Sequence, residues 1–247
     1  MIIIAHRGES HDAPENTLAA INLAWQRNAD AVEIDIHLTK DNKIVVIHDN
    51  STWRFDGNFQ KIEDQTLEEL KPIDVGSHKG RQWADERIPE LGEVLDTVPE
   101  NKFIFIEIKT GSEILSESKN VIDKSKLQPE QIKLIGFDFD VMKKAREIFK
   151  NLEIFWIINI AYLEMSNSWQ PEIVQILDKI QSANFNGLDI SASELIDKNF
   201  VDIIKNAGFR VYVWTVNYLK EARRLLEAGV EGITTNRAQW LKMELGK

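Results

Sequence analysis

The chain contains 247 residues, of which 43% are hydrophobic and 28% are charged, and its formal net charge at pH 7 is −10. This composition is that of an ordinary globular protein, and the length favours one barrel-sized domain over two small ones. The negative charge argues against binding to nucleic acid or to an anionic membrane through a broad basic face. Because cysteine is absent, disulfides and thiolate metal ligands are excluded, so any metal must be held by oxygen or histidine nitrogen.

The first residues, 1–6, run directly into an apolar segment that has no basic region and no cleavage site. This segment is too short to be a signal peptide or a transmembrane helix. We therefore expect a cytoplasmic protein without stable membrane insertion, although removal of a leader would leave the same sequence.

Runs rich in Ile, Val and Phe alternate with longer amphipathic segments, a pattern typical of βα units. The strand-like runs are 2–6, 31–36, 43–48, 102–108, 131–137, 153–158, 186–190, 210–215 and 230–234. These nine runs are one more than an eight-stranded barrel holds. The segment 39–42 between the second and third runs is a turn-forming tetrad, whereas a parallel crossover needs about a dozen residues. We therefore predict that 43–48 returns antiparallel, as the second arm of a hairpin.

Without that arm, each of the eight remaining runs is followed by a helix-like segment. The helices are expected at 16–27, 91–98, 112–125, 139–150, 170–182, 193–206, 218–228 and 237–245. Asn16 or Thr17 can cap the first helix, and Gly208 and Gly229 stand where helices should end. Eight βα units in one run favour a (β/α)8 barrel over a doubly wound sheet.

Residues 49–90 interrupt this rhythm because they contain no clear strand–helix unit. Loops of this length in compact domains are usually functional. We therefore predict a single catalytic barrel domain, 1–247, with a small insertion at 49–90 over the barrel mouth.

Ionisable residues gather at the ends of three barrel strands: His6, Arg7, Glu33, Asp35, Glu107 and Lys109. In (β/α)8 barrels the active site forms at the carboxyl ends of the strands. Side chains at positions i and i+2 of a strand share a face, so Glu33 and Asp35 can both face the barrel interior. The same spacing applies to Glu107 and Lys109.

The hairpin gives a hypothesis for His48. If 39–42 is the loop, Leu38 opposes Lys43, and counting back along both arms brings His48 opposite Glu33. Directly opposed residues share a face with Cβ atoms ~5 Å apart, so His48 would enter the carboxylate cluster. A slip of one residue would point it away.

These residue types suit a phosphate ester and a divalent metal. Glu33, Asp35 and Glu107 cannot all stay ionised at close range without a compensating cation, and oxygen ligation points to Mg²⁺ or Ca²⁺. His6 and His48 supply a general acid and a general base near neutral pH. Arg7 and Lys109 offer a planar fork and a point charge for phosphate oxygens.

Each of these residues also has an ordinary structural explanation when taken alone. Arg7 could simply pair with Glu33, and Glu107 could be salt-bridged or half exposed. His37 shares the face of Glu33 by strict alternation but lies nearer the turn, so we assign it no role. Trp214, at the end of the run 210–215, either packs inside the barrel or forms a wall for a glycerol or alcohol group.

The chain also carries an ordered set of motifs: HRG at 6–8, PENT at 14–17, EID at 33–35, LTKD at 38–41, VVIHD at 45–49, EIK at 107–109, WTVN at 214–217 and TNR at 235–237. This set, which spans nearly the whole chain, resembles the glycerophosphodiester phosphodiesterase family. The resemblance implies a (β/α)8 barrel with a small subdomain inserted after the second strand. It also implies hydrolysis of deacylated phospholipids to glycerol 3-phosphate and an alcohol.

Carried over residue by residue, the resemblance implies that Glu33, Asp35 and Glu107 bind one divalent metal, Mg²⁺ or Ca²⁺. His6 and His48 then form the acid–base pair. Arg7, Lys109 and Trp214 become candidates for binding the substrate, a small-molecule glycerophosphodiester. The sequence departs from the family in the hairpin turn, where Asn42 replaces glycine, and at 52–55 and 136–137. These departures leave the metal and histidine residues intact but bear on the preference for the alcohol group.

Three alternatives remain open at this stage. A phospholipase D-like activity on lysophospholipids would use an apolar surface, for which Trp53, Phe55, Phe59 and Trp83 are candidates. A catalytically silent barrel would only bind a phosphorylated ligand. A glycosidase with Glu33 and Glu107 as its carboxylate pair would leave the histidines and Arg7 without a purpose.

Overall fold

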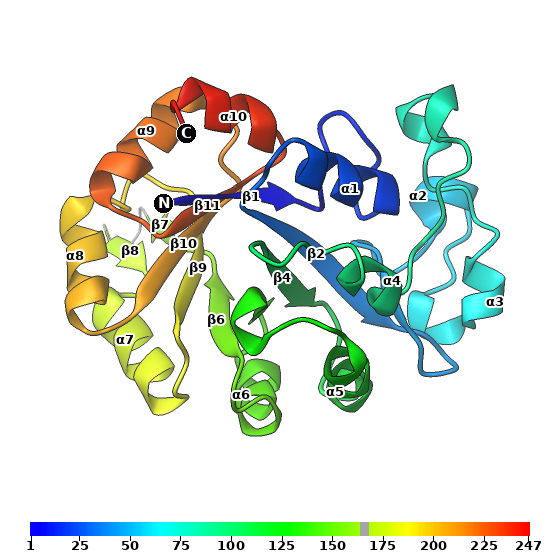
Figure 1. Ribbon diagram of the computed structural model, residues 1–247. Helices are drawn as coiled ribbons and strands as arrows, with labels where there is room; N and C mark the ends of the chain where they lie inside the picture. The colour runs from blue at the N-terminus through cyan, green and yellow to red at the C-terminus, as the bar shows by residue number, and fades with distance from the viewer. Residues whose placement is uncertain (164–167) are drawn as a thin grey trace.

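The computed structural model describes residues 1–163 and 168–247, and its centre is a closed barrel of parallel strands surrounded by helices (Figure 1). Around the barrel the strands follow the order β1, β11, β10, β9, β6, β5, β4, β2, and β1 pairs with β2 to close it. The antiparallel strand β3 pairs with β2 outside the barrel. The predicted (β/α)8 fold and the antiparallel hairpin are therefore confirmed.

Each barrel strand is followed by a helix on the outside of the barrel. The barrel strands are β1 (Ile2–His6), β2 (Ala31–Leu38), β4 (Phe103–Ile108), β5 (Ile132–Gly136), β6 (Glu153–Ile158), β9 (Gly187–Ser191), β10 (Arg210–Trp214) and β11 (Gly232–Thr235). The outer helices are α1 (Leu18–Gln26), α4 (Leu91–Leu95), α5 (Ile114–Lys124), α6 (Phe139–Ile148), α7 (Ile173–Ser182), α8 (Lys198–Asn206), α9 (Leu219–Ala228) and α10 (Ala238–Glu244). The short 3-10 helix η4 (Pro129–Gln131) precedes β5.

Residues of the barrel strands alternate between two apolar cores, because successive side chains point to opposite faces. The core inside the barrel consists of Ile4, Ala31, Phe105, Ile135, Phe155, Ile157 and Tyr212. The Tyr212 ring meets Phe105 and Phe155 edge to face, with centroids 5.0 and 4.9 Å apart. The second core, which includes Ile3 and Val32, lies between the strands and the helices. The barrel is therefore packed solid through its middle, and polar chemistry is confined to its ends.

Residues 49–90 form short helices beside the barrel, at the right of Figure 1. These are α2 (Trp53–Asp56), η1 (Ile62–Asp64), α3 (Leu67–Leu70), η2 (Ser77–Lys79) and η3 (Arg81–Trp83). They have a small core of their own, in which Val45 and Ile47 pack with Ile62, Leu70, Val75 and Ile88. This core attaches the insertion to the face of β3 (Ile44–Val46) that carries Val45, opposite to the face of Ile44 and Val46.

The register of the β2–β3 hairpin differs by one residue from our prediction. Leu38 pairs with Ile44 and not with Lys43. The expectation that His48 lies directly opposite Glu33 is therefore wrong.

The turn explains the difference. The Thr39 amide donates to the carbonyl of Lys43 at 2.9 Å, so the loop has three residues, and Asn42 takes a left-handed φ of 57°. Three-residue hairpin loops commonly end with a residue in this conformation, and asparagine accepts it. The regular ladder ends at Val46, and His48 belongs to the irregular segment that follows β3.

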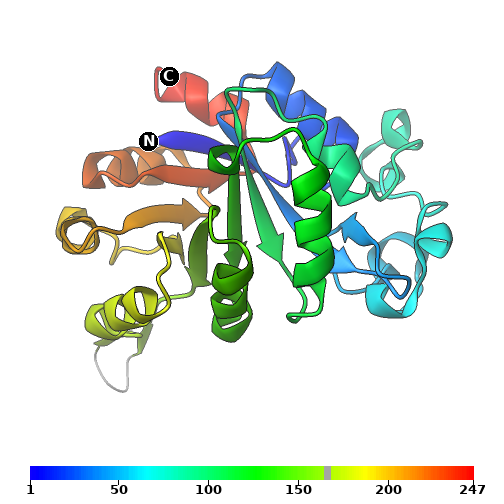
Figure 2. The ribbon, with the colours of Figure 1, turned by 60° about the horizontal axis from the view of Figure 1, so that its bottom comes forward.

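Two expected helices begin later than predicted. The segment 168–170 forms strand β8 (Ser168–Gln170), which pairs antiparallel with β7 (Ala161–Leu163) in a separate two-stranded sheet, and α7 starts only after Pro171. Proline disfavours helical geometry in the residue before it, so the residue that precedes Pro171 stays outside the helix. In α8 the Asp197 side chain accepts a hydrogen bond from the Phe200 amide at 2.8 Å, so this cap sets the start. Figure 2 shows α7 and α8 on the same side of the barrel.

Within the described ranges, none of the helices has the length and apolar character needed to cross a membrane.

Candidate active site

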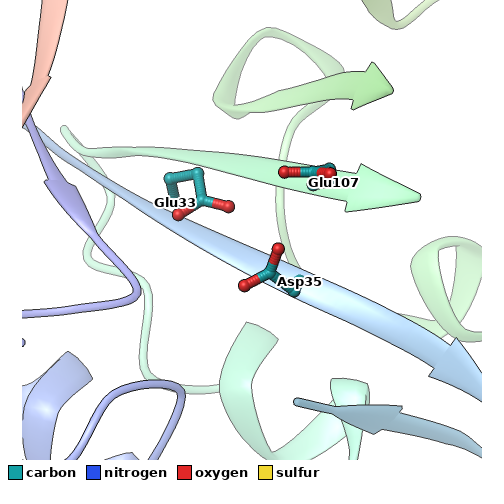
Figure 3. A group of neighbouring side chains, drawn as sticks. All are labelled: Glu33, Asp35 and Glu107. Atoms are coloured by element: carbon teal, nitrogen blue, oxygen red, sulfur yellow. The ribbon is translucent and has the colours of Figure 1, made fainter. Parts of the chain in front are cut away.

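Three carboxylates meet at the carboxyl end of the barrel. Glu33 and Asp35 project from β2, and Glu107 projects from the adjacent position on β4, where it pairs in register with Asp35 (Figure 3). One oxygen from each lies within 4.8 Å of the others, and all three residues are buried. The i and i+2 spacing on one strand thus brings Glu33 and Asp35 to one face, as expected from strand alternation.

The pKa values of these three carboxyl groups show the electrostatic cost of burying them close together. Burial raises the pKa of Glu33 well above its usual value, and Asp35 and Glu107 raise it further. Burial, and then Asp35, raises the pKa of Glu107 to about 7. Burial alone would also raise the pKa of Asp35, but Arg7 and Lys109 outweigh it and lower that pKa.

These carboxylates fit a divalent cation. Within the ranges that the structure describes, Glu33 Oε1 and Asp35 Oδ1 are buried without a hydrogen-bond partner. Buried carboxylate oxygens normally have partners, and an anionic oxygen-only cluster is the ligand set that Mg²⁺ or Ca²⁺ prefers. Glu33, Asp35 and Glu107 could therefore hold one such ion.

Two cations contact this cluster. Arg7 Nε lies 3.0 Å from Asp35 Oδ2, and its Nη1 donates to Glu15 Oε1 at 3.0 Å. Lys109 Nζ donates to Glu107 Oε1 at 2.8 Å and lies 3.5 Å from Asp35 Oδ1. Arg7 pairs with Asp35 and Glu15 through its side chain, whereas its backbone amide donates to Glu33 Oε2 at 3.0 Å.

The tight turn after β1 aims Arg7 at the cluster. Arg7 has a left-handed φ of 58°, and Gly8 follows with a φ of 83°. A Cβ atom on Gly8 would lie 2.5 Å from the backbone of Ala20 in α1, so no larger residue fits there. The close approach of this turn to α1 explains the glycine of the HRG motif.

His6 is held in one tautomer. Its Nδ1 lies 2.6 Å from Asn236 Oδ1, and its Nε2 lies 3.9 Å from Glu33 Oε2. Because an amide oxygen can only accept, Nδ1 carries the proton and the lone pair is on Nε2. Burial, followed by the positive charge of Arg7, lowers the pKa of His6 to about 4, so the ring is neutral at pH 7.

His48 has a different set of partners. Its Nδ1 lies 2.8 Å from Asp49 Oδ1, and its backbone carbonyl accepts from His37 Nε2 at 3.1 Å. Asp49 in turn pairs with Arg54 of the insertion at 2.9 Å. The Asp49 carboxylate can only accept a hydrogen bond, so Nδ1 donates to it and the orientation of the imidazole ring is fixed.

Seven of the eight residues predicted for the site line one cavity of about 280 Å³: His6, Arg7, Glu33, His48, Glu107, Lys109 and Trp214. Asp35 lies behind them and is fully buried. The far wall of the cavity consists of Ile135, Phe137, Ile157, Trp214 and Asp189. His48 lines the cavity as expected, although the hairpin register from which its position was predicted is wrong.

A larger hollow of about 700 Å³ lies at the opposite end of the barrel, where the strands begin. Three of its charged residues are paired with one another, since Glu153 accepts from both Lys133 and Arg210. In barrels of this kind this end contributes to stability rather than to chemistry.

Several residues around the site were missed by sequence reasoning. Asn16, taken as a possible helix cap, instead donates from Nδ2 to Asp35 Oδ2 at 2.8 Å, while Thr17 caps α1. His37 is buried and holds the backbone of His48. Asn236 belongs to the TNR motif, which was the only sequence signal for it. Asp189 had no signal beyond a single carboxylate in an apolar strand.

The comparisons with known proteins agree with this geometry. The model of the glycerophosphoryl diester phosphodiesterase family matches residues 6–239. A glycerophosphodiester phosphodiesterase from Caldanaerobacter subterraneus is 30% identical over 95% of this chain and 93% of its own length. The chain belongs to the glycerophosphoryl diester phosphodiesterase family. It is therefore a phosphoric diester hydrolase, and the resemblance noted in the sequence is confirmed.

Relatives in the family extend to mammals and to solved structures. Glycerophosphodiester phosphodiesterase 1 from Mus musculus is 31% identical over 88% of this chain and 72% of its own length. A phosphodiesterase from Oleispira antarctica, solved with the product sn-glycerol-3-phosphate, is 26% identical, with a TM-score of 0.89 over 100% of this chain and 97% of that one. The glycerophosphodiester phosphodiesterase from Thermotoga maritima is also 26% identical, with a TM-score of 0.78 over 98% and 97% of the two chains.

Proposed function

We propose that this family member hydrolyses glycerophosphodiesters to glycerol 3-phosphate and an alcohol, with one divalent metal held by Glu33, Asp35 and Glu107. The observation that carries the proposal is the buried carboxylate cluster, in which Glu33 Oε1 and Asp35 Oδ1 have no hydrogen-bond partner in the described part of the chain, at a cavity that two histidines also line. The product bound to the Oleispira antarctica relative supports the substrate class. The catalytic unit is taken as the single domain 1–247, with 49–90 inserted beside the site.

A bound divalent metal supplies Lewis-acid stabilisation of the charge on the phosphate oxygens. The chain adds fixed positive charge from Lys109 and Arg7, which both line the cavity. These cations stay charged at neutral pH because the pKa of each is raised, although burial, the largest effect, acts in the opposite direction. Preorganised charges of this kind favour a transition state in which negative charge develops.

The two histidines take different roles. His6 acts as the base, because Asn236 fixes its Nδ1 proton and leaves the Nε2 lone pair for a proton of the attacking hydroxyl group or water. His48 acts as the acid, because Asp49 accepts from its Nδ1 and orients the ring so that the other ring nitrogen can give a proton to the departing alkoxide. General acid–base catalysis of this kind contributes about 10²- to 10⁴-fold each.

The test is turnover of glycerophosphocholine, glycerophosphoethanolamine and glycerophosphoglycerol with EDTA, Mg²⁺ or Ca²⁺. We expect activity that requires metal and is lost in Glu107→Gln. Metal-independent turnover, or no turnover of any diester with either ion, would contradict the proposal.

A change of leaving group separates the histidines. With a p-nitrophenyl diester the leaving group needs no proton, so His48→Ala should retain most activity there and lose about 10²- to 10⁴-fold on glycerophosphocholine. His6→Ala should lose activity on both substrates. The reverse pattern would exchange the two roles.

A second candidate, hydrolysis of lysophospholipids, is favoured by one observation. Trp53 and Phe59 of the insertion are 54% and 76% exposed, and their rings stack with centroids 5.4 Å apart. Such a pair suits an acyl chain. Turnover of lysophosphatidylcholine by the wild type, reduced in Trp53→Ala without loss on glycerophosphocholine, would support this activity.

A further inference from the structure

Asp189 is a buried carboxyl group that the acid–base and metal chemistry does not use. It lies on β9, is 2% exposed, and lines the cavity on the side away from β1 and β2. Within the described ranges its Oδ1 has no hydrogen-bond partner. The group of carboxylates whose oxygens lie within 4.8 Å of one another comprises Glu33, Asp35 and Glu107 and does not include it. Asp189 is therefore not explained as a member of the metal cluster.

The surroundings of Asp189 are apolar. Ile157 pairs with it in register on β6, and Tyr212, whose ring belongs to the barrel core, pairs with it on β10. Burial raises the pKa of Asp189 well above its usual value, with a further contribution from the charge of Glu107. Both effects favour the protonated carboxylic acid, a form that can both donate and accept a hydrogen bond.

The same residue orients part of the cavity wall. Trp214 Nε1 donates to the Asp189 backbone carbonyl at 3.3 Å, and the Trp214 ring meets Phe137 edge to face with centroids 5.6 Å apart. The wall opposite the charged cluster is therefore apolar, with the carboxyl of Asp189 as a polar group facing the cavity. Such a surface matches a short carbon chain that carries hydroxyl groups.

We propose that Asp189 determines substrate specificity by hydrogen bonding a hydroxyl group of the glyceryl moiety. This inference rests on the proposed function. The cluster of Glu33, Asp35 and Glu107 and the cations Arg7 and Lys109 take the phosphate. The glyceryl chain then extends across the cavity toward β9, where its carbons contact Trp214 and Phe137. An unpartnered polar group destabilises the fold, and a hydroxyl of the ligand supplies the missing partner.

The test compares four proteins: the wild type, Asp189→Leu, Asp189→Asn and Glu9→Gln. The leucine variant removes the hydrogen bond, and the asparagine variant keeps both a donor and an acceptor. Glu9 is the matched control because it is also 2% exposed, has an unpartnered Oε2 within the described ranges, and lies outside the cavity. If the leucine variant does not fold, Asp189→Ala takes its place.

The substrates are glycerophosphocholine and its two deoxy analogues, the 3-hydroxypropyl and 2-hydroxypropyl phosphocholines. We expect the wild type to prefer the parent by about 10- to 100-fold in kcat/KM over at least one analogue. Asp189→Leu should abolish this preference by losing activity on the parent and on the analogue that keeps the bound hydroxyl, but not on the analogue that lacks it, whereas Asp189→Asn and Glu9→Gln should keep most of the preference. Equal losses on all three substrates, or no preference in the wild type, would overturn the proposal.

Two further measurements separate this inference from the proposed function. Asp189→Leu should raise Tm by roughly 2 to 10 °C, because it removes a buried group without a partner. In binding assays the wild type should bind sn-glycerol 3-phosphate more tightly than inorganic phosphate, and the leucine variant should lose most of this preference. If the wild type hydrolyses no glycerophosphodiester, the proposed function fails, and this binding comparison still decides the role of Asp189. An unchanged preference for sn-glycerol 3-phosphate in the leucine variant would refute it.

Discussion

Replacement of Glu107 by glutamine should stabilise the metal-free protein. Burial and the neighbouring Asp35 raise the pKa of Glu107 from 4.5 to about 7. A carboxyl whose pKa is raised on folding contributes stability at low pH and loses it as the pH rises through the folded value. At pH 8 the ionised side chain therefore works against folding, and glutamine, which mimics the protonated form, does not.

The size of the effect follows from the shift. A shift from 4.5 to about 7, at about 1.36 kcal/mol per pKa unit, gives roughly 3 kcal/mol at pH 8 and about 2 kcal/mol at pH 6. The side chain is only 11% exposed, so solvent screening reduces this figure little. For a chain of this size it corresponds to a rise in Tm of roughly 5 to 10 °C at pH 8.

The assay is thermal unfolding in EDTA and in excess Mg²⁺ or Ca²⁺, at pH 6 and pH 8. Glu107→Gln should melt above the wild type in EDTA, and the gain should be larger at pH 8. With metal the order should reverse, because ligand binding stabilises the wild type by mass action and the variant lacks one ligand. Glu113→Gln, at an exposed position in the loop after β4, is the control and should leave Tm unchanged with and without metal. A lower Tm for Glu107→Gln in EDTA at pH 8 would show that the Lys109 ion pair outweighs the cost of burial and refute this reasoning.

Three further predictions concern the groups around the cluster. Metal binding at pH 7 should release about one proton, because the pKa values of Glu33 and Glu107 are raised and both groups must ionise to bind the metal. Calorimetry in buffers of different ionisation enthalpy measures this release, and identical heats of metal binding in all buffers would contradict it. Asn236→Ala should lower kcat by about 10- to 100-fold, because the His6 ring loses its hydrogen-bond partner and is free to rotate. The metal concentration that gives half-maximal activity should not change, and a matching loss of metal affinity would indicate a structural role instead. Arg54→Ala should lower kcat on glycerophosphocholine more than on a p-nitrophenyl diester, because Asp49 loses its partner and holds His48 less firmly. Equal losses of kcat on the two substrates would show that Arg54 does not act through His48.

The fold and most of the site could be predicted because both follow from short-range patterns. Strand alternation places Glu33 and Asp35 on one face, and the carboxyl ends of parallel strands meet at one end of a barrel. The hairpin register could not be predicted in this way. It depends on Asn42 adopting a left-handed conformation, which leaves three residues in the loop instead of the predicted four and shifts every pair in the ladder by one.

Residues that act over long sequence distances were also out of reach. His6 and Asn236 are 230 positions apart, and only closure of the barrel by the pairing of β1 with β11 brings them together. Asp189 stands in the sequence Gly-Leu-Asp-Ile, where one carboxylate in a strand has several ordinary explanations. That its Oδ1 has no hydrogen-bond partner among the described residues is a property of the packed barrel and cannot be seen in the strand alone.

The position of His48 does not depend on the turn at 39–42, contrary to the prediction from the hairpin register. The ladder ends before His48, and two contacts then fix this residue: its carbonyl accepts from His37, and its ring meets Asp49, which Arg54 of the insertion holds. Arg54 also donates to Glu15, the partner of Arg7, so one insertion residue connects the histidine to the cation beside the metal cluster. The insertion therefore contributes to the geometry of His48, and a change in the insertion would move this histidine as well as alter the shape of the cavity.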